Sequence, residues 1–284
     1  AAEYYYTGGV LDHLVGSLKE STYTFEQARD LSIQAMRNQL EYVTSSTKTS
    51  ISHSIAQEGN VIWDDEKFIA VGYNNTGIST STDGVTWSFV PSANIQGSNQ
   101  QNNFNDILFN KWAVGERGVP EYIAVGQTGV IFTSNDGFNW YEKQGVNSRD
   151  YNAVAYDGTT YVVVGDAINA SGNPTIVTSQ NGNTWVNRSG QGGTSIGVGQ
   201  NLYDVIYNDD YDAFYAVGDA GLIVKSTDSG ATWTKLEGGT TNTIRSISWH
   251  EGVMVAGVDR AEVLISDDGG ITWEANTITN TVTT

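Results

Sequence analysis

Among the residues of this 284-residue sequence that could take part in a reaction, three aspartates show the clearest pattern. Asp166 and Asp219 each follow a short apolar stretch that ends in glycine, and Asp259 lies one residue later in a third stretch of this kind. Two carboxylates at a suitable separation can hydrolyse a glycosidic bond. Aspartate also accepts hydrogen bonds in tight loops. We favour the loop role; the alternative is a polar rim that binds a sugar or a cation.

Other reactive side chains show no pattern typical of a site. His13, His53 and His250 are far apart and lack the spacing of metal ligands. The chain has no cysteine, and it contains neither a phosphate-binding loop nor a nucleophile elbow. We therefore predict no catalytic residue, no metal and no cofactor.

The charge of the chain limits the classes of molecule that it can bind. With a formal net charge of −18 and only 14 basic residues, it lacks the clustered cations that nucleic-acid binding requires. No run of 18 apolar residues occurs, so membrane insertion is not expected. Protein or carbohydrate partners remain.

A short box, S-x-D-G-x-x-W with small variations, occurs five times between residues 60 and 276. Its tryptophans are 40 to 53 residues apart, which is typical of a four-stranded propeller blade. The acidic or amide residue and the tryptophan of the five boxes are Asp83 and Trp87, Asp136 and Trp140, Asn181 and Trp185, Asp228 and Trp233, and Asp268 and Trp273. We expect the box to be structural: a side-chain-capped turn followed by an apolar anchor.

A second signature precedes each box: FIAVG, YIAVG, YVVVG, FYAVG and VMVAG, the last at residues 253–257. Such near-continuous apolar stretches are typical of strands that pack on both faces. Two-residue turns such as Asp157-Gly158 indicate hairpins. The sequence therefore predicts an all-β fold, a five-bladed β-propeller of four-stranded antiparallel blades.

The combined pattern, as in GQTGVIFTSNDGFNW from Gly126 and GDAGLIVKSTDSGATW from Gly218, resembles the Asp-box or bacterial neuraminidase repeat superfamily. It is similar to the propellers of photosystem II assembly factors and of phage and extracellular proteins, and covers about three quarters of the chain. The resemblance implies a propeller but not a particular function. Sialidases of the superfamily carry an Arg-Ile-Pro motif, which is absent here. Their arginine cluster has no counterpart in Arg149, Arg188, Arg245 and Arg260, so we reject that activity.

Residues 1–48 do not belong to the repeat. A Thr-x-x-Gln capping box at Thr24 begins a predicted helix with a broad apolar arc. The candidate docking residues on this helix are Phe25, Leu31, Ile33, Met36, Leu40 and Val43. Two interpretations remain open: the helix plugs its own propeller, or it packs against another protein subunit. Residues 49–59 form a linker or an edge strand, and residues 60–284 form the propeller domain.

Three inserts interrupt the repeat pattern. Residues 91–105 and 189–201 are rich in amides or glycine and are expected as loops on one rim, suited to carbohydrate or protein recognition. Residues 110–121 are expected at the opposite face, with Trp112 as a contact anchor.

These features together favour a non-catalytic structural or interaction propeller. We predict a virion component, such as a phage tail, neck or capsid-surface protein, or a secreted adhesion or assembly module. It would be an oligomer or part of a larger assembly, located in a virion or outside the cell, with host-surface carbohydrate as a further partner. The alternative is a carbohydrate-active enzyme that uses acidic residues at the propeller mouth.

Overall fold

A computed structural model describes residues 59–73, 77–97, 103–111, 113, 119–170, 172–190, 196–260 and 262–277. The chain divides into two compact units, residues 1–54 and 55–284, and all described residues belong to the second. The predicted helices, the linker to residue 58 and Trp112 lie outside the described residues. Nowhere in the described ranges is a helix long and apolar enough to cross a membrane.

Five sheets follow one another along the described part of the chain. The first contains β1 (Val61–Trp63), β2 (Phe68–Val71), β3 (Ile78–Ser81) and β4 (Ser88–Phe89). The second contains β6 (Phe104–Phe109), β7 (Tyr122–Gly126), β8 (Ile131–Ser134) and β9 (Trp140–Lys143), with β5 (Ile95–Gln96) beside β9. The third contains β10 (Tyr151–Tyr156), β11 (Tyr161–Ala167), β12 (Pro174–Ser179) and β13 (Val186–Asn187).

The last two sheets repeat this order. The fourth contains β14 (Leu202–Asn208), β15 (Ala213–Gly218), β16 (Ile223–Ser226) and β17 (Thr234–Leu236). The fifth contains β18 (Ile244–His250), β19 (Val253–Val258), β20 (Glu262–Ser266) and β21 (Glu274–Thr277). Three short 3₁₀ turns are η1 (Ser92–Asn94), η2 (Gln127–Gly129) and η3 (Asp219–Gly221).

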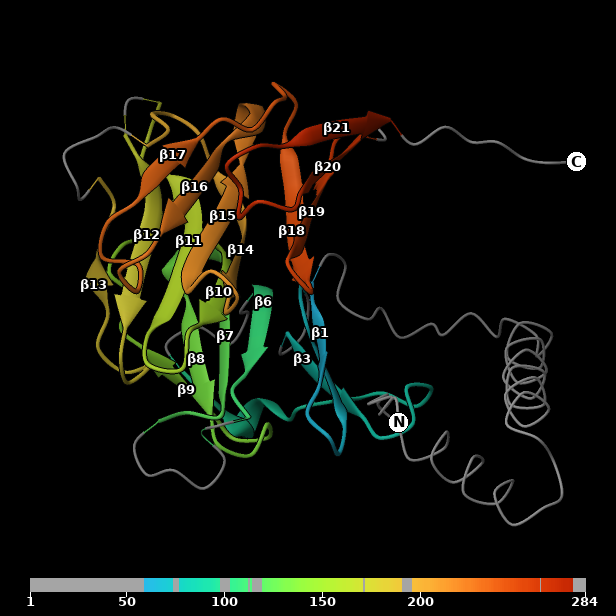
Figure 1. Cartoon of the computed structure of the whole chain (residues 1–284). Helices are drawn as coiled ribbons and strands as arrows, with labels where there is room; N and C mark the ends of the chain where they lie inside the picture. Colours follow the sequence, from blue (N-terminus) through green and yellow to red (C-terminus); the bar gives the residue numbers. More distant parts are fainter. Residues whose placement is uncertain are drawn as a thin grey trace, which may run out of the picture. The chain divides into compact units, whose positions relative to one another are not determined.

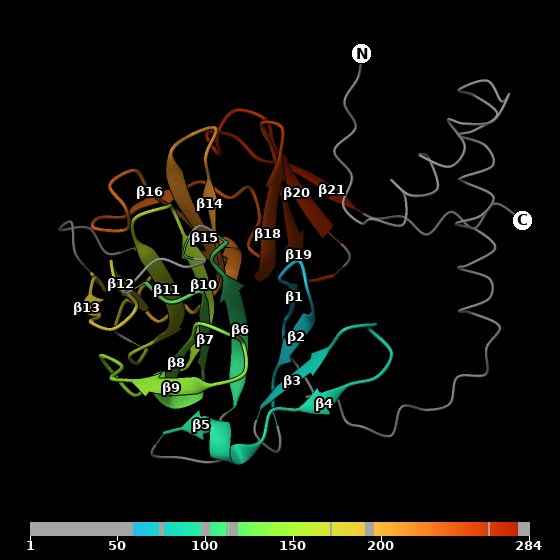
Figure 2. The same ribbon diagram turned by 90° about the horizontal axis from the view of Figure 1, so that it is seen from below.

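Each sheet is an antiparallel meander whose first strand lies nearest the centre of the array (Figures 1 and 2). Hydrophobic clusters join the first sheet to the second, the second to the third, the third to the fourth and the fourth to the fifth. The chain thus folds as a β-propeller-like array of packed sheets.

One strand departs from the expected four per sheet. β5 lies in the insert at residues 91–105 and pairs parallel with β9, Ile95 opposite Trp140. The insert is therefore a loop only in part, because its apolar Ile95 is buried against the second sheet.

The five box turns form by short-range hydrogen bonds. In the second, Ser134 Oγ donates to Asp136 Oδ1 at 3.0 Å, and the same Oδ1 accepts the backbone N–H groups of Phe138 and Asn139 at 2.8 and 2.7 Å. Asn181 makes the same turn through its amide oxygen, which accepts from Asn183 and Thr184 at 2.9 Å. The turn needs only an acceptor at this position, so asparagine replaces aspartate.

The strand register corrects one alignment made from the sequence. Met254 pairs with Ser266 in the fifth sheet, just as Phe214 pairs with Ser226 in the fourth. Met254, the second residue of VMVAG, is therefore equivalent to Phe214, so the match to the other repeats begins one residue later than the motif suggests. Gly257 therefore lies inside β19, and Val258 takes the place of Gly218. The motif alone gave the wrong register, because a run of valine, alanine and glycine looks similar when it is shifted by one residue.

Candidate functional site at the mouth of the sheet array

The first strands of four sheets contain a β-bulge near their beginning. The register skips Asn105, Asn152, Tyr203 and Arg245, each the second residue of its strand. A bulge turns the side chain of the extra residue away from the regular face. The four polar side chains meet residues at or just beyond the ends of the second strands, and we call this end of the array the mouth.

On one side of the mouth, hydrogen bonds run from sheet to sheet. Tyr73 Oη donates to Asn105 Oδ1 at 2.9 Å. Asn105 Nδ2 donates to the backbone oxygen of Tyr151 at 2.8 Å. Asn152 repeats the arrangement one sheet on: its Nδ2 lies 2.8 Å from the backbone oxygen of Leu202 and 3.0 Å from Asp166 Oδ1. Amide side chains thus connect neighbouring first strands.

On the other side, the equivalent positions hold an aromatic and a cationic residue. Tyr203 Oη donates to Asp219 Oδ1 at 2.9 Å. Arg245 donates to both carboxylate oxygens of Asp259, at 3.1 and 3.0 Å. The Arg245 guanidinium also lies 4.7 Å from the centroid of the Tyr203 ring. A cation over an aromatic face is a favourable contact, so it couples the fourth and fifth sheets.

The three aspartates predicted from the sequence occupy equivalent places at this mouth. The backbone N–H groups of Asp166, Asp219 and Asp259 donate hydrogen bonds at 2.9, 3.0 and 2.9 Å. In each case the acceptor is the backbone oxygen of the residue directly before the first strand of the same sheet. Asp259 lies at the same position as the others because of the register shift in β19. Burial raises the pKa of Asp166, and the charges of Asp150 and Asp219 add to this effect. All three carboxylates accept hydrogen bonds from neighbouring side chains.

The described ends of both amide-rich inserts also reach the mouth. Asn103 Nδ2 donates to Gln127 Oε1 at 2.8 Å, and Gln200 Nε2 donates to the backbone oxygen of Asp219 at 2.7 Å. The backbone N–H of Asn201 donates to Asp219 Oδ2 at 3.0 Å. The described C-terminal ends of the two inserts thus lie on one rim, whereas Ile95 and Gln96 of the first insert lie beside β9.

Below the mouth lie two carboxylates that sequence analysis missed, of which Asp106 is buried and Asp204 is partly buried. Asp106 Oδ2 accepts the backbone N–H of Val154 in the next sheet at 2.8 Å. Asp204 Oδ2 accepts the N–H of Ile247, again in the next sheet, at 2.8 Å. Each therefore binds a backbone donor that a neighbouring strand leaves free. Both residues directly follow the bulge residue of their first strand, and the sequence alone does not reveal that bulge.

Burial shifts both carboxyls toward the protonated form. Desolvation raises the pKa of Asp106 to about 6, although Asn60 Nδ2 donates to it at 2.6 Å. Desolvation also raises the pKa of Asp204 to about 7, and the charge of Asp106 contributes. These residues are placed to stabilise the array, since their oxygens bind backbone donors of two sheets.

Another acidic residue lies in the turn between β1 and β2. Asp64 is buried: it accepts the phenol of Tyr122 at 2.7 Å and pairs with Lys67 at 2.8 Å. Despite burial, its hydrogen bonds to Lys67 and Tyr122 lower the pKa of Asp64. A turn residue of the first sheet thus anchors the second.

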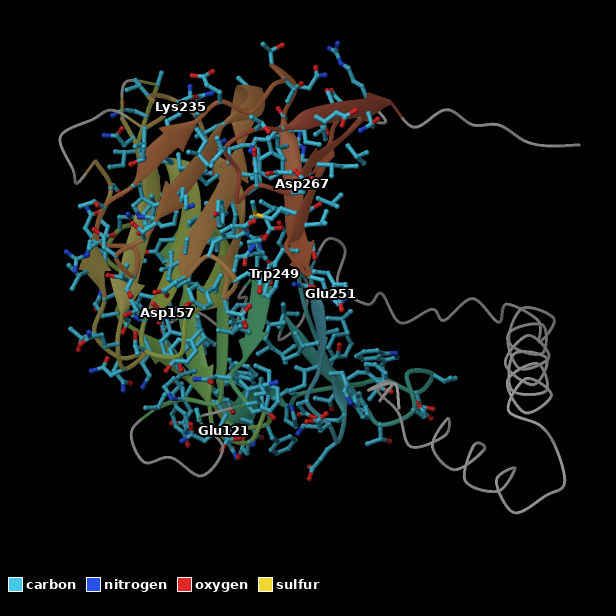
Figure 3. All side chains as sticks on the ribbon, in the orientation of Figure 1. Glu121, Asp157, Lys235, Trp249, Glu251 and Asp267 are labelled. Atoms are coloured by element: carbon cyan, nitrogen blue, oxygen red, sulfur yellow. The ribbon has the colours of Figure 1, made fainter. Side chains whose placement is uncertain are left out.

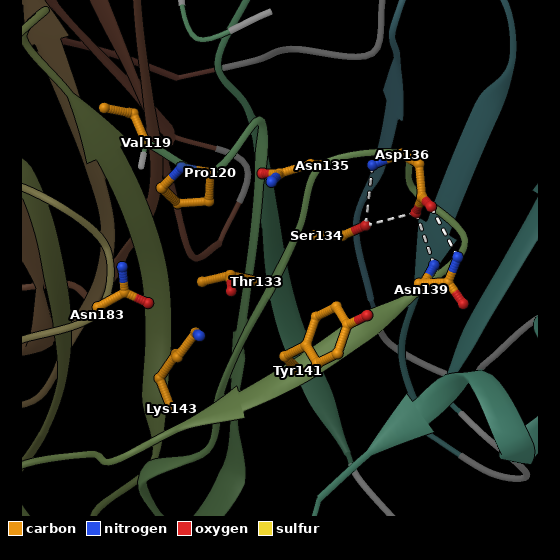
Figure 4. Close-up of a pocket in the computed structure, with 10 residues that line it drawn as sticks. All are labelled: Val119, Pro120, Thr133, Ser134, Asn135, Asp136, Asn139, Tyr141, Lys143 and Asn183. Atoms are coloured by element: carbon orange, nitrogen blue, oxygen red, sulfur yellow. Dashed lines mark hydrogen bonds between the residues drawn. The ribbon is translucent and has the colours of Figure 1, made fainter. Parts of the chain in front are cut away.

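Shallow polar grooves lie beside the box turns, away from the mouth. One, of about 290 Å³, is lined by residues of the second and third sheets, among them Pro120, Tyr141, Lys143 and Asn183 (Figure 4). A second, of about 450 Å³, repeats it one sheet on, with Arg188 where the first has Lys143. The repetition follows from sheet packing, because the same two elements meet at each junction.

The four arginines do not all lie at the mouth. Arg245 lies at the mouth, whereas Arg188 lies in an outer groove, where its Nε donates to Thr178 Oγ1 at 3.2 Å. Among the described residues, no group of three or more histidine or acidic side chains is placed to hold a metal ion. His250 is exposed at the end of β18, and the other two histidines lie outside the described residues.

Comparison with known proteins supports the fold. No protein-family model and no curated protein matches the sequence. Among solved structures, YCF48 bound to a D1 peptide matches with a TM-score of 0.55 and 17% identity, over 80% of this chain and 68% of that one. The WD40 propeller of Doa1 matches with a TM-score of 0.54 and 12% identity, over 78% and 68%. The chain is therefore similar to β-propellers.

An enzyme is also among the similar solved structures. The GH74 enzyme of Niastella koreensis matches with a TM-score of 0.53 and 16% identity, over 76% of this chain but only 30% of the enzyme. At these identities the likeness concerns the fold alone.

Proposed function

We propose that this chain is a five-bladed Asp-box propeller that acts as a non-catalytic interaction or assembly module. The observation that carries the proposal is the use of the mouth carboxylates. Asp219 and Asp259 are held by Tyr203 and Arg245, and Asp166 by Asn152. An acid-base pair for glycoside hydrolysis needs carboxyls that reach a substrate. Here they instead accept hydrogen bonds that organise the mouth.

The similar propellers support a role in protein binding. YCF48 was solved with a D1 peptide bound, and WD40 propellers occur among the other similar structures. We propose protein subunits as partners of this chain, with host-surface carbohydrate as a further partner. A virion or an extracellular location remains part of the proposal, and the acidity of the chain, −18, is compatible with either.

The proposal assigns docking to residues 1–48. Their predicted apolar arc, around Leu31 and Ile33, lies outside the described residues. An exposed apolar arc of this kind typically marks an interface. Replacement of Leu31 and Ile33 by aspartate should release the propeller from its partner subunits while its far-ultraviolet spectrum stays unchanged. A matched control replaces Ser45 and Ser46, beyond the arc, by aspartate. Unchanged partner binding by the Leu31 and Ile33 variant would contradict the docking role.

The enzymatic alternative has a direct test. The raised pKa of Asp166 is the one feature that favours it, since a general acid must hold its proton. We expect purified full-length protein to hydrolyse neither sialyl nor other glycoside substrates. Asp166→Asn and Asp219→Asn should leave partner binding intact. Turnover that disappears in either variant would overturn the proposed function.

A further inference from the structure

The box turns of four sheets pack on the second strand of the preceding sheet. A Cβ atom added to Gly137 would lie 2.7 Å from Ile69 Cδ1, and one added to Gly230 would lie 2.8 Å from Val162 Cγ2. A Cβ atom added to Gly270 would lie 3.0 Å from Tyr215 Cε1, and one added to Gly182 would meet Pro120 first and Ile123 Cδ1 at 3.4 Å. The box glycine and one position of the second strand therefore define each junction between sheets.

Among the described residues, the box of the first sheet has no partner of this kind in another sheet. The three atoms nearest to an added Cβ on Gly84 belong to the ring of Phe68 in its own sheet, at 3.4 to 4.0 Å. Trp87 is half-buried, whereas Trp140 and Trp233 in later boxes are buried. Nearby Trp63 is 47% exposed. We call the surface of Phe68, Gly84 and Trp87 the box face.

The fifth sheet has the matching vacant position. Val255 pairs with Ile265 as Val162 pairs with Thr178, so Val255 is the residue that a following box glycine would contact. Val162 is fully buried, but Val255 is 41% exposed and Val253 39%. Ser248 and Ile265, the direct cross-strand partners of Val255, share its side of the sheet. We call Ser248, Val253, Val255 and Ile265 the strand face.

The two faces do not cover each other within the described part of the chain, where no hydrophobic cluster joins the fifth sheet to the first. In Figures 1 and 2 the end of the β18–β19 hairpin approaches the beginning of β1, while the two sheets diverge. Figure 3 labels Trp249 and Glu251 at this hairpin end. The array therefore ends in two complementary surfaces, each lacking the neighbour that every inner sheet has.

We propose that the strand face of one molecule binds the box face of a second copy of the chain. The contact would repeat the junction that already joins consecutive sheets, with Gly84 against Val255 and Trp87 over the strand face. Because the two faces differ, the association is head-to-tail and continues until a ring of molecules closes or a filament forms. This inference does not depend on the docking role proposed for residues 1–48, but it requires that the first and fifth sheets stay apart within one chain.

Charge predicts how this association responds to salt. At −18, two copies repel each other, and screening by salt weakens that repulsion. The faces themselves are mainly uncharged, so salt should strengthen the contact. Weakening by salt would indicate that ion pairs hold the copies together and would overturn the proposed contact.

The first experiment is sedimentation velocity on the full chain over a wide concentration range. The wild-type mass should rise above that of a monomer, and Val255→Glu should weaken self-association about tenfold or more, because it buries an unpaired charge. Val186→Glu is the matched control: Val186 is 45% exposed on β13, outside both faces. A wild-type chain that stays monomeric, or a Val255→Glu variant that associates as wild type does, overturns the proposal.

The second experiment separates two copies from one chain closing on itself. The sequence has no cysteine, so Val85→Cys and Val255→Cys each introduce a single thiol. Mixed single variants treated with a short bismaleimide should give a crosslinked dimer that neither variant gives alone. The double variant should give crosslinked multimers. An intramolecular crosslink in the double variant, with no dimer in the mixture, would show that the first and fifth sheets close within one chain and would overturn the proposal.

Discussion

The third and fifth sheets share a strand order but differ in their surroundings. In the third, every residue of β11 from Tyr161 to Gly165 is buried, because sheets pack on both sides. In β19 only one face is buried: Met254 and Ala256 contact the fourth sheet, while Val253 and Val255 are exposed. Strands of similar apolar composition thus have different burial. Position in the array decides how much each apolar residue contributes.

The same contrast extends to polar groups. Trp233 Nε1 donates to the backbone oxygen of Gly230 at 3.0 Å, as in the other inner boxes. The buried indole nitrogen of Trp273, in the fifth box, has no such acceptor. Asp204 connects the fourth sheet to the fifth, but the equivalent residue of the fifth sheet is Ser246, with a shorter side chain. The end of the array has weaker connections than the middle.

The largest test of this contrast compares two box tryptophans. Trp233→Ala should lower the free energy of unfolding by about 3–5 kcal/mol, because a large aromatic leaves a packed junction. Trp87→Ala removes the same side chain from the half-buried box face and should cost about 1 kcal/mol in the monomer. Urea denaturation followed by circular dichroism measures both. Equal losses would show that the box face is covered within the monomer.

The second test concerns pH. The pKa of Asp204 is raised to about 7 and that of Asp106 to about 6, so between pH 4 and pH 7 the folded state binds more protons than the unfolded state. The free energy of unfolding should therefore fall as pH rises through this window, by on the order of 2–4 kcal/mol. Asp204→Asn should reduce the dependence of the free energy of unfolding on pH near pH 7. Measurement at high salt, which screens the general charge repulsion, separates the two effects.

Below pH 4 the free energy of unfolding should change with pH in the opposite direction. Hydrogen bonds from the backbone N–H of Thr86 and the side chain of Thr272 lower the pKa of Asp83 and Asp268, each to about 2. Their contribution to stability is lost as pH falls from about 4 toward 2.

Stability that rises continuously with pH from 4 to 7 would contradict the assigned role of Asp204.

The third test uses equivalent valines. Val162→Ala should cost about 2 kcal/mol because it empties a buried junction, whereas Val255→Ala should cost less than about 0.5 kcal/mol in the monomer. Chemical denaturation at a concentration below self-association measures the difference. A loss for Val255→Ala as large as that for Val162→Ala would mean that the strand face is buried in the monomer.

The last test concerns the mouth. The side chains of Arg245 and Asp259 are 53% and 43% exposed, so Arg245→Gln should cost less than about 1 kcal/mol. Asn152→Ala, which breaks hydrogen bonds between the third and fourth sheets, should cost about 1–3 kcal/mol. Thermal unfolding of both variants checks the order. A reversed order would place the stronger connection at the end of the array.

The sequence by itself predicted the features that depend on neighbours along the chain. Each box turn forms between residues two to four positions apart, so its serine, its aspartate and its glycine could be recognised without the fold. The same holds for Asn181, whose oxygen serves the turn as predicted. Periodic apolar strands and two-residue turns predicted the all-β class for the same reason: their hydrogen bonds close between adjacent segments.

Only the tertiary structure decided which residues meet between sheets. Asp106 binds the N–H of Val154, 48 residues away, and no local pattern marks that pair. The bulges that direct Asn152 and Arg245 to the mouth depend on cross-strand register, which a run of valine, alanine and glycine does not specify. The exposure of Val255 depends on whether another sheet covers it. Burial is a property of the whole array, so a strand that reads as fully apolar can still present one face to solvent.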